Sequence, residues 1–171
     1  MTHFFIPQLL QIDIDEQLAK VGRNNFIFTE GHKKEFALQR YFNSNYVYKK
    51  DSKPFYQHCD IESKQASVKS SGSTLFINGK IINDTTSVED AVEYYISNCV
   101  AQKYYIVLQS NKWIPTPKNH YLVIELNKKE MKKLLLKYGC TDRDSKAHRK
   151  NALRLKRTDS VITKWYRLER I

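Results

Sequence analysis

The sequence predicts an α/β protein with a mixed central sheet flanked by helices. Two segments dense in β-branched and aromatic residues, YYIVLQ at 104–109 and YLVIEL at 121–126, are typical of internal strands. Helical patterns of apolar residues at 31–42, 88–99 and 128–138 alternate with strand-like segments. Because such helices each have an apolar face to bury, we expect them to pack on the sheet.

The N-terminal region is expected to begin with a helix over 8–21. Apolar side chains recur there at helical spacing, and Gly22 follows as a stop. Short strands are expected at 25–29 and 45–50, on either side of the next helix.

The helix expected at 31–42 carries a carboxylate on its apolar face. Glu35, Leu38 and Phe42 fall at positions i, i+3 and i+7, which share one face of a helix. A solvated surface glutamate is not expected on that face. Glu35 is therefore predicted to lie on the buried side.

A tight hairpin is expected to follow, with strands at 59–62 and 66–70 joined by the polar turn ESKQ. The next strand, TLFI at 74–77, precedes Asn78-Gly79, which is the strongest short signal for a hairpin turn. Two later helices have clear starting signals. Ser87 with Asp90 forms a capping box, and Asn127 caps the helix that runs to Gly139.

The C-terminal region, 140–171, is predicted to be a basic extension of a core at about 31–139, within one domain of residues 1–171. Its segments LRLKR and VITKWYRL are expected to pair as a hairpin across TDS. This region holds the densest basic run of the chain: Arg143, Lys146, Arg149, Lys150, Arg154, Lys156 and Arg157.

The composition points to a polyanionic partner. The chain has 29 Lys and Arg against 18 Asp and Glu, which gives a net charge of +11 and a pI near 9.5. Each phosphate that a basic side chain neutralises releases condensed counterions, so nucleic acid is favoured. No apolar run is long enough to cross a bilayer, and no membrane partner is expected. The three cysteines are widely spaced, which predicts reduced thiols in a cytoplasmic protein and argues against a zinc module.

The expected hairpin brings groups of opposite charge together. Alternation along each strand puts Asp60 and Glu62 on one face, and Ser67 and Lys69 on one face. Two adjacent strands can therefore aim a carboxylate and an ammonium into one shallow pocket. Glu35 could reach that pocket from the buried face of the preceding helix.

These groups suit the cleavage of a phosphodiester. A divalent cation neutralises developing charge and lowers the pKa of an attacking water. Mg²⁺, for which Mn²⁺ is the expected substitute, takes a couple of carboxylates and keeps its other positions for water and phosphate oxygens. A lysine can orient the water or stabilise the developing charge. The sequence thus predicts a catalytic site of Asp60, Lys69 and Glu35.

The order of these elements over residues 31–126 resembles the PD-(D/E)XK nuclease superfamily, which includes type II restriction endonucleases and Holliday-junction resolvases. The resemblance is carried by a helix with Glu35, a strand with Asp60, and a strand with SVK at 67–69. It implies a restriction-endonuclease-like core in which Asp60 is a metal ligand and Lys69 is the catalytic lysine. Glu35 would be the helix acid that completes or orients the metal site.

The sequence departs from the family pattern at Ser67, where an acid is expected two residues before Lys69. Members of the superfamily with SVK here recruit a displaced glutamate from the following helix. Three glutamates are candidates for the missing metal ligand, and the sequence leaves the choice open: Glu62, Glu89 and Glu93.

Double-stranded DNA is the expected partner. Two symmetric subunits would cut both strands most simply, so a homodimer is expected. Serines next to Lys69 can bond phosphate oxygens, and the basic tail can hold the backbone. The residues expected to contact nucleic acid are Ser70, Ser71, Arg149, Lys150, Arg154, Lys156 and Arg157.

The leading hypothesis is a Mg²⁺-dependent DNA endonuclease of the type II restriction class. The first alternative is a non-catalytic nucleic-acid-binding module of the same fold, which Ser67 in place of an acid favours. The second is a junction-resolving or structure-specific nuclease with the same site. The third is an RNA-binding protein of unrelated α/β fold, for which charge is the only support.

Overall fold

The fold is described from a computed structural model of the chain. The structure describes residues 1–21, 30–43, 59–70, 74–78, 87–110, 113–142, 152–156 and 158–169. The strands expected at 25–29 and 45–50, and the turn at Gly79, lie outside these residues.

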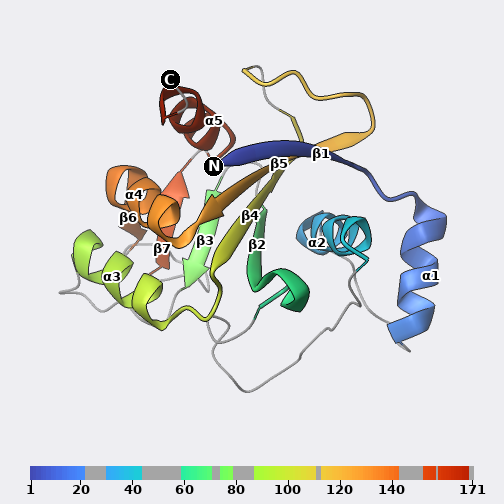
Figure 1. Cartoon of the computed structure of the whole chain (residues 1–171), viewed down its shortest axis with the longest axis horizontal. Helices are drawn as coiled ribbons and strands as arrows, with labels where there is room; N and C mark the ends of the chain where they lie inside the picture. The colour runs from blue at the N-terminus through green and yellow to red at the C-terminus, as the bar shows by residue number, and fades with distance from the viewer. Residues whose placement is uncertain are drawn as a thin grey trace.

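Helices separate groups of one or two strands along the chain (Figure 1). The strands are β1 (Thr2–Pro7), β2 (Ala66–Ser70), β3 (Thr74–Asn78), β4 (Lys103–Leu108), β5 (His120–Asn127), β6 (Gly139–Asp142) and β7 (Ala152–Lys156). The helices are α1 (Gln11–Val21), α2 (Glu30–Tyr41), the short 3₁₀ helix η2 (Glu62–Lys64), α3 (Val88–Asn98), α4 (Lys128–Tyr138) and α5 (Thr158–Glu169).

The larger sheet has four strands in the order β1-β5-β4-β2. β5 is antiparallel to both β1 and β4, whereas β2 runs parallel to β4. The expected mixed sheet is therefore confirmed. β2 is the last strand of this sheet, and it presents its outer edge to the segment that precedes it. The smaller sheet has three antiparallel strands in the order β3-β7-β6.

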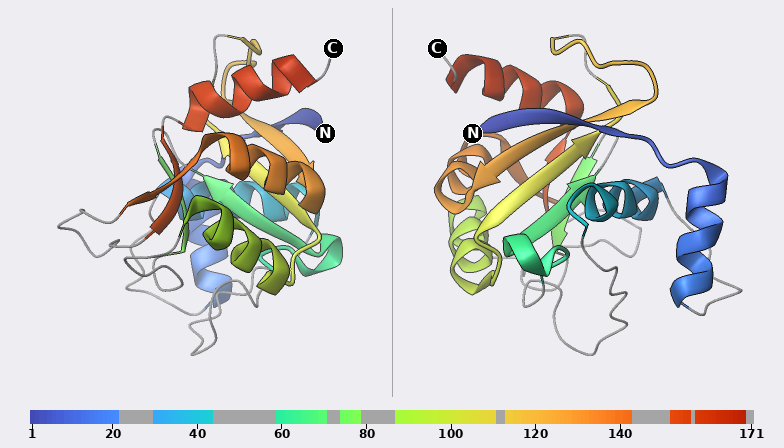
Figure 2. Two further views of the ribbon diagram at one scale, coloured as in Figure 1. Left: turned by 90° about the vertical axis from the view of Figure 1, so that its left-hand side faces the viewer. Right: turned by 45° about the vertical axis from the view of Figure 1, so that its right-hand side comes forward.

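Helices cover both faces of the larger sheet, as Figures 1 and 2 show. On one face, Ala37 and Leu38 of α2 pack with Val68 of β2 and Tyr105 of β4 in one apolar cluster. On the other face, α3, α4 and α5 pack with alternate residues of β4 and β5 and with β7 in a second cluster. Burial of each large apolar side chain contributes about 1.5–3 kcal/mol, so these two clusters hold the layers together.

The local signals that start the later helices are confirmed. The Ser87 hydroxyl accepts a hydrogen bond from the Asp90 main-chain N–H at 3.1 Å. Asn127 and Glu130 form the reciprocal hydrogen bonds of a capping box. Gly139 follows α4, and a Cβ there would lie 2.3 Å from the Leu135 carbonyl oxygen. A side chain at position 139 would therefore force the backbone to shift.

The first strand and the C-terminal region differ from expectation. Thr2–Pro7 forms β1, an edge strand held by pairing with β5, and the helix starts only at Gln11. The prediction of a C-terminal hairpin is wrong, because residues 158–169 form α5. Ile162 and Trp165 of this helix are buried in the larger core cluster. The described part of 140–171 thus contributes side chains to the core.

The prediction of a strand at 59–62 is also wrong. Asp60 lies in a bend, Ile61 makes a single bridge with Ala66, and Glu62 begins η2. Gln65 closes this turn in the left-handed conformation, with φ of 48°. The reversal is therefore tighter than a two-stranded hairpin, and it brings Asp60 back to the outer edge of β2.

Candidate active site

The Asp60 carboxylate is held at the outer edge of β2. The main chains of Ile61 and Ala66 exchange two hydrogen bonds, both 3.1 Å long. Asp60 Oδ2 then accepts from the Val68 main-chain N–H at 2.7 Å and from the Ser67 hydroxyl at 3.2 Å. An edge strand leaves alternate N–H groups unpaired, and the carboxylate satisfies one of them. Asp60 is thereby fixed beside the strand that carries Lys69.

Lys69 is half-buried and shares one face of β2 with Ser67. Ser67 itself is buried and bonded to Asp60, so Asp60 lies toward the face on which Lys69 lies. Val68, between them, points into the cluster under α2. Because neighbouring residues of a strand point to opposite faces, Lys69 lies on the face of β2 that does not pack against this cluster.

Helix α2 lies beside β2 and brings two polar side chains to Asp60 (Figure 2). Gln39 is 2 % exposed, and its Nε2 donates to the Asp60 main-chain oxygen at 3.0 Å. Glu35 lies one helical turn before Gln39 and therefore on the same face of the helix. Three elements, α2, the bend at Asp60 and β2, thus meet at this edge of the sheet.

Titratable groups from these three elements interact electrostatically. The pKa of Glu35 is raised from 4.5 to about 8, mainly because burial removes water from its carboxyl group. The negative charge of Asp60 raises this pKa further, and the positive charge of Lys69 lowers it. Glu35, Asp60 and Lys69 are therefore close enough to interact, and Glu35 retains its proton at neutral pH. A buried acid with a strongly perturbed pKa beside a charged partner is typical of a functional site.

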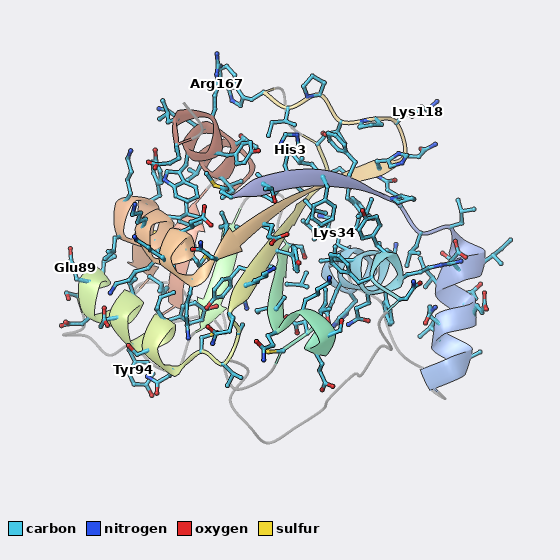
Figure 3. All side chains as sticks on the ribbon, in the orientation of Figure 1. His3, Lys34, Glu89, Tyr94, Lys118 and Arg167 are labelled. Carbon is cyan, nitrogen blue, oxygen red and sulfur yellow. The ribbon has the colours of Figure 1, made fainter. Side chains whose placement is uncertain are left out.

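The structure does not bring the helix α3 glutamates to this site. Ala91 and Tyr95 face the core, so Glu89 and Glu93 lie on the exposed side of α3. The Glu93 carboxylate is 2.5 Å from the Lys132 ammonium of α4, and this bond lowers its pKa. Figure 3 shows Glu89 on the opposite side of the sheet from Lys34 of α2.

The structure gives no support to the expectation that Glu89 or Glu93 replaces the missing motif acid, because both lie on the exposed side of α3 and Glu93 is bonded to Lys132. Glu62, the third candidate, does not share a strand face with Asp60. It is the first residue of η2 and is exposed.

The residues expected to contact nucleic acid are only partly described. Ser70 ends β2 and is half-buried, on the opposite face from Lys69. Arg154 and Lys156 lie on β7, in register with Phe76 and Thr74 of β3, so they belong to the smaller sheet. Four of the expected residues, and the side chain of Lys156, lie outside the described part of the chain: Ser71, Arg149, Lys150 and Arg157.

Two buried polar residues of α2, Gln39 and Lys34, are not among the site residues predicted from the sequence. Gln39 follows Glu35 by four positions in the apolar stripe of the helix, and this spacing was visible in the sequence. Lys34 is 6 % exposed, and its ammonium lies 6.0 Å from the centre of the Tyr121 ring. No sequence signal distinguishes Lys34 from the exposed lysines around it.

The side chains at this edge suit a hard divalent cation. Glu35 and Asp60 are carboxylates, and Gln39 Oε1 is a buried amide oxygen that has no hydrogen-bond partner among the described residues. Leaving such an oxygen unsatisfied costs about 1–3 kcal/mol, so a ligand that satisfies it is favoured. No described group of three or more His, Cys, Asp or Glu side chains could hold a metal ion. The donors instead fit Mg²⁺, which needs only one or two carboxylates and keeps several waters.

Comparisons with family models, curated proteins and solved structures find no match for this chain. In the part of the chain that the structure describes, no helix has the length and apolar character needed to span a bilayer.

Proposed function

We propose that this protein is a metal-dependent endonuclease that hydrolyses phosphodiester bonds in double-stranded DNA. The observation that carries the proposal is the convergence of Glu35, Asp60 and Lys69 at the edge of β2. The element order supports a restriction-endonuclease-like core and membership of the PD-(D/E)XK nuclease superfamily. In that order a helix acid precedes an aspartate, and a parallel strand carries the lysine.

Each residue of the site would have a separate role in such a reaction. A bound Mg²⁺ would lower the pKa of an attacking water and neutralise charge on the scissile phosphate. Asp60 is fixed by two hydrogen bonds, so it can hold the cation without reorganising. Glu35 must lose its proton to act as a second ligand, and its raised pKa makes that step dependent on pH. Lys69 would stabilise the charge that develops on the phosphate oxygens.

The charge of the chain supports the choice of substrate. A net charge of +11 favours contact with a phosphate backbone. Two copies related by a two-fold axis would present one site to each strand of the duplex, so we propose a homodimer. The three cysteines are free, which supports a reducing compartment such as the cytoplasm.

One observation favours a second function, a nucleic-acid-binding module without catalysis. No third carboxylate is placed at the site by the described contacts: Glu62 is exposed on η2, and Glu93 is paired with Lys132. Two carboxylates alone hold Mg²⁺ less firmly than three.

A plasmid assay separates the two functions. The purified chain should convert supercoiled plasmid to nicked or linear forms with Mg²⁺ or Mn²⁺, and EDTA should stop the conversion. A gel shift in EDTA measures binding to the same DNA without cleavage. Binding without nicking in either metal would favour the module and overturn the endonuclease. A branched substrate cut much faster than linear duplex would instead identify a junction-resolving enzyme.

A further inference from the structure

Gln39 is a buried amide with one group bonded and one group unsatisfied. Its side chain is 2 % exposed, and Nε2 donates to the Asp60 main-chain oxygen at 3.0 Å. This bond orients the amide, because a reversed amide would face one carbonyl oxygen with another. Oε1 has no donor within hydrogen-bonding distance in the described part of the chain.

The surroundings of Gln39 are those of the candidate site. Glu35 precedes it by one turn on the same face of α2, and residues at this spacing are neighbours. The Gln39 amide touches the residue that carries the second carboxylate, Asp60. Ala37 and Leu38, which flank it on the helix, belong to the apolar cluster beneath α2. The unpaired amide oxygen therefore belongs to a side chain that contacts Asp60 and is a helical neighbour of Glu35.

A purely structural role accounts for Nε2 of the Gln39 amide but not for Oε1. The hydrogen bond from Nε2 helps to hold the Asp60 bend against α2. It does not explain why a second polar atom is buried with no donor, since buried polar atoms are nearly always paired. A cation or a hydrogen-bond donor from outside the described residues would satisfy Oε1.

We infer that Gln39 supplies a third oxygen to the divalent cation at Glu35 and Asp60. The inference rests on the metal site of the proposed function and deepens it. Amide oxygens are ordinary ligands of hard cations. The nuclease family pattern expects the third donor to be an acid at position 67. In this chain α2 would provide that donor, and Ser67 remains bonded to Asp60.

Binding of Mn²⁺ alone tests this inference without any cleavage assay. The unbound Mn²⁺ is measured by electron paramagnetic resonance during titration of the whole chain. Gln39→Met keeps the side-chain volume and removes the oxygen, and we expect it to weaken Mn²⁺ binding by about 10- to 100-fold. Gln39→Glu keeps an oxygen donor, and we expect affinity at least equal to that of the wild type, with a steeper dependence on pH. Gln102→Met, at an exposed glutamine, is the matched control and should bind as the wild type does.

The outcomes are distinguishable. Unchanged Mn²⁺ affinity in Gln39→Met would overturn the inference and leave the site of Glu35 and Asp60 intact. Affinity of Gln39→Glu as weak as that of Gln39→Met would show that only the bond from Nε2 matters, and would also overturn it. If Gln39→Met does not fold, the affinity and pH dependence of Gln39→Glu decide. A wild-type chain that binds no Mn²⁺ would remove both the inference and the proposed metal site.

Discussion

Lys69→Ala is expected to lower the rate of Mg²⁺-dependent plasmid nicking by about 10²–10³-fold, the usual effect of removing one electrostatic donor from a transition state. Lys69 is half-buried on the face of β2 that also holds Ser67, the hydroxyl partner of Asp60. In the proposed reaction its ammonium would act mainly on the additional charge that develops in the transition state, so the affinity for uncut DNA should change little. Single-turnover nicking and a gel shift in EDTA measure the two effects separately.

The matched control is Lys103→Ala. Lys103 lies on the neighbouring strand β4, is exposed, and pairs with Glu125 at 3.3 Å. The substitution removes the same charge from the protein, at a lysine whose ammonium is bonded to Glu125. We expect this variant to nick at the wild-type rate. Wild-type nicking by Lys69→Ala would remove Lys69 from the site.

Glu35→Gln is expected to stabilise the folded protein at alkaline pH. The pKa of Glu35 is about 8 in the folded chain, because burial and the charge of Asp60 disfavour its ionised form. In the unfolded chain a glutamate titrates near its ordinary value. Between these two values the folded state keeps a proton that the unfolded state has lost. The free energy of unfolding of the wild type therefore falls as the pH rises, by up to about 1.4 kcal/mol per pH unit.

Glutamine at position 35 cannot ionise, so this contribution disappears in the variant. Urea unfolding at pH 5, 6, 7 and 8, with EDTA present, should give curves for wild type and Glu35→Gln that diverge toward pH 8, with the variant more stable. Glu93→Gln is the control. The pKa of Glu93 is lowered by Lys132, so it is ionised across this range and its replacement adds no slope. Parallel pH dependences for wild type and Glu35→Gln would show that Glu35 is not desolvated.

The features that could be predicted from sequence are those specified by local chemistry. The helix caps at Ser87 and Asn127 depend on residues three positions apart, and both are confirmed. The strand Ala66–Ser70 and the helix that carries Glu35 are confirmed for a similar reason, since their apolar periodicity lies within a few residues. Alternation along β2 and the apolar face of α2 was enough to place Lys69 beside Ser67 and Glu35 on the buried side of its helix, whereas the strand predicted for Asp60 is a bend.

Features that depend on distant contacts were missed. β1 exists because it pairs with β5, more than a hundred residues away. Whether Asp60 enters a strand or a bend depends on the left-handed turn at Gln65 and on the bond from Gln39, which no local pattern contains. Glu93 appeared suitable from helix position alone, but it lies on the exposed side of α3 and is bonded to Lys132 of α4. The spacing of Ile162 and Trp165 is that of one face of a helix, and the strand predicted for this stretch is wrong.

The central claim is that Glu35 and Asp60 together hold a divalent cation, and proton release on binding tests it most directly. Titration calorimetry with Mn²⁺ at pH 7, in buffers with different heats of ionisation, gives the number of protons released per ion. Because Glu35 is mostly protonated at this pH, binding should release about one proton, and Glu35→Gln should bind more weakly and release none. Binding with no proton release, or equal binding by Glu35→Gln, would contradict the claim.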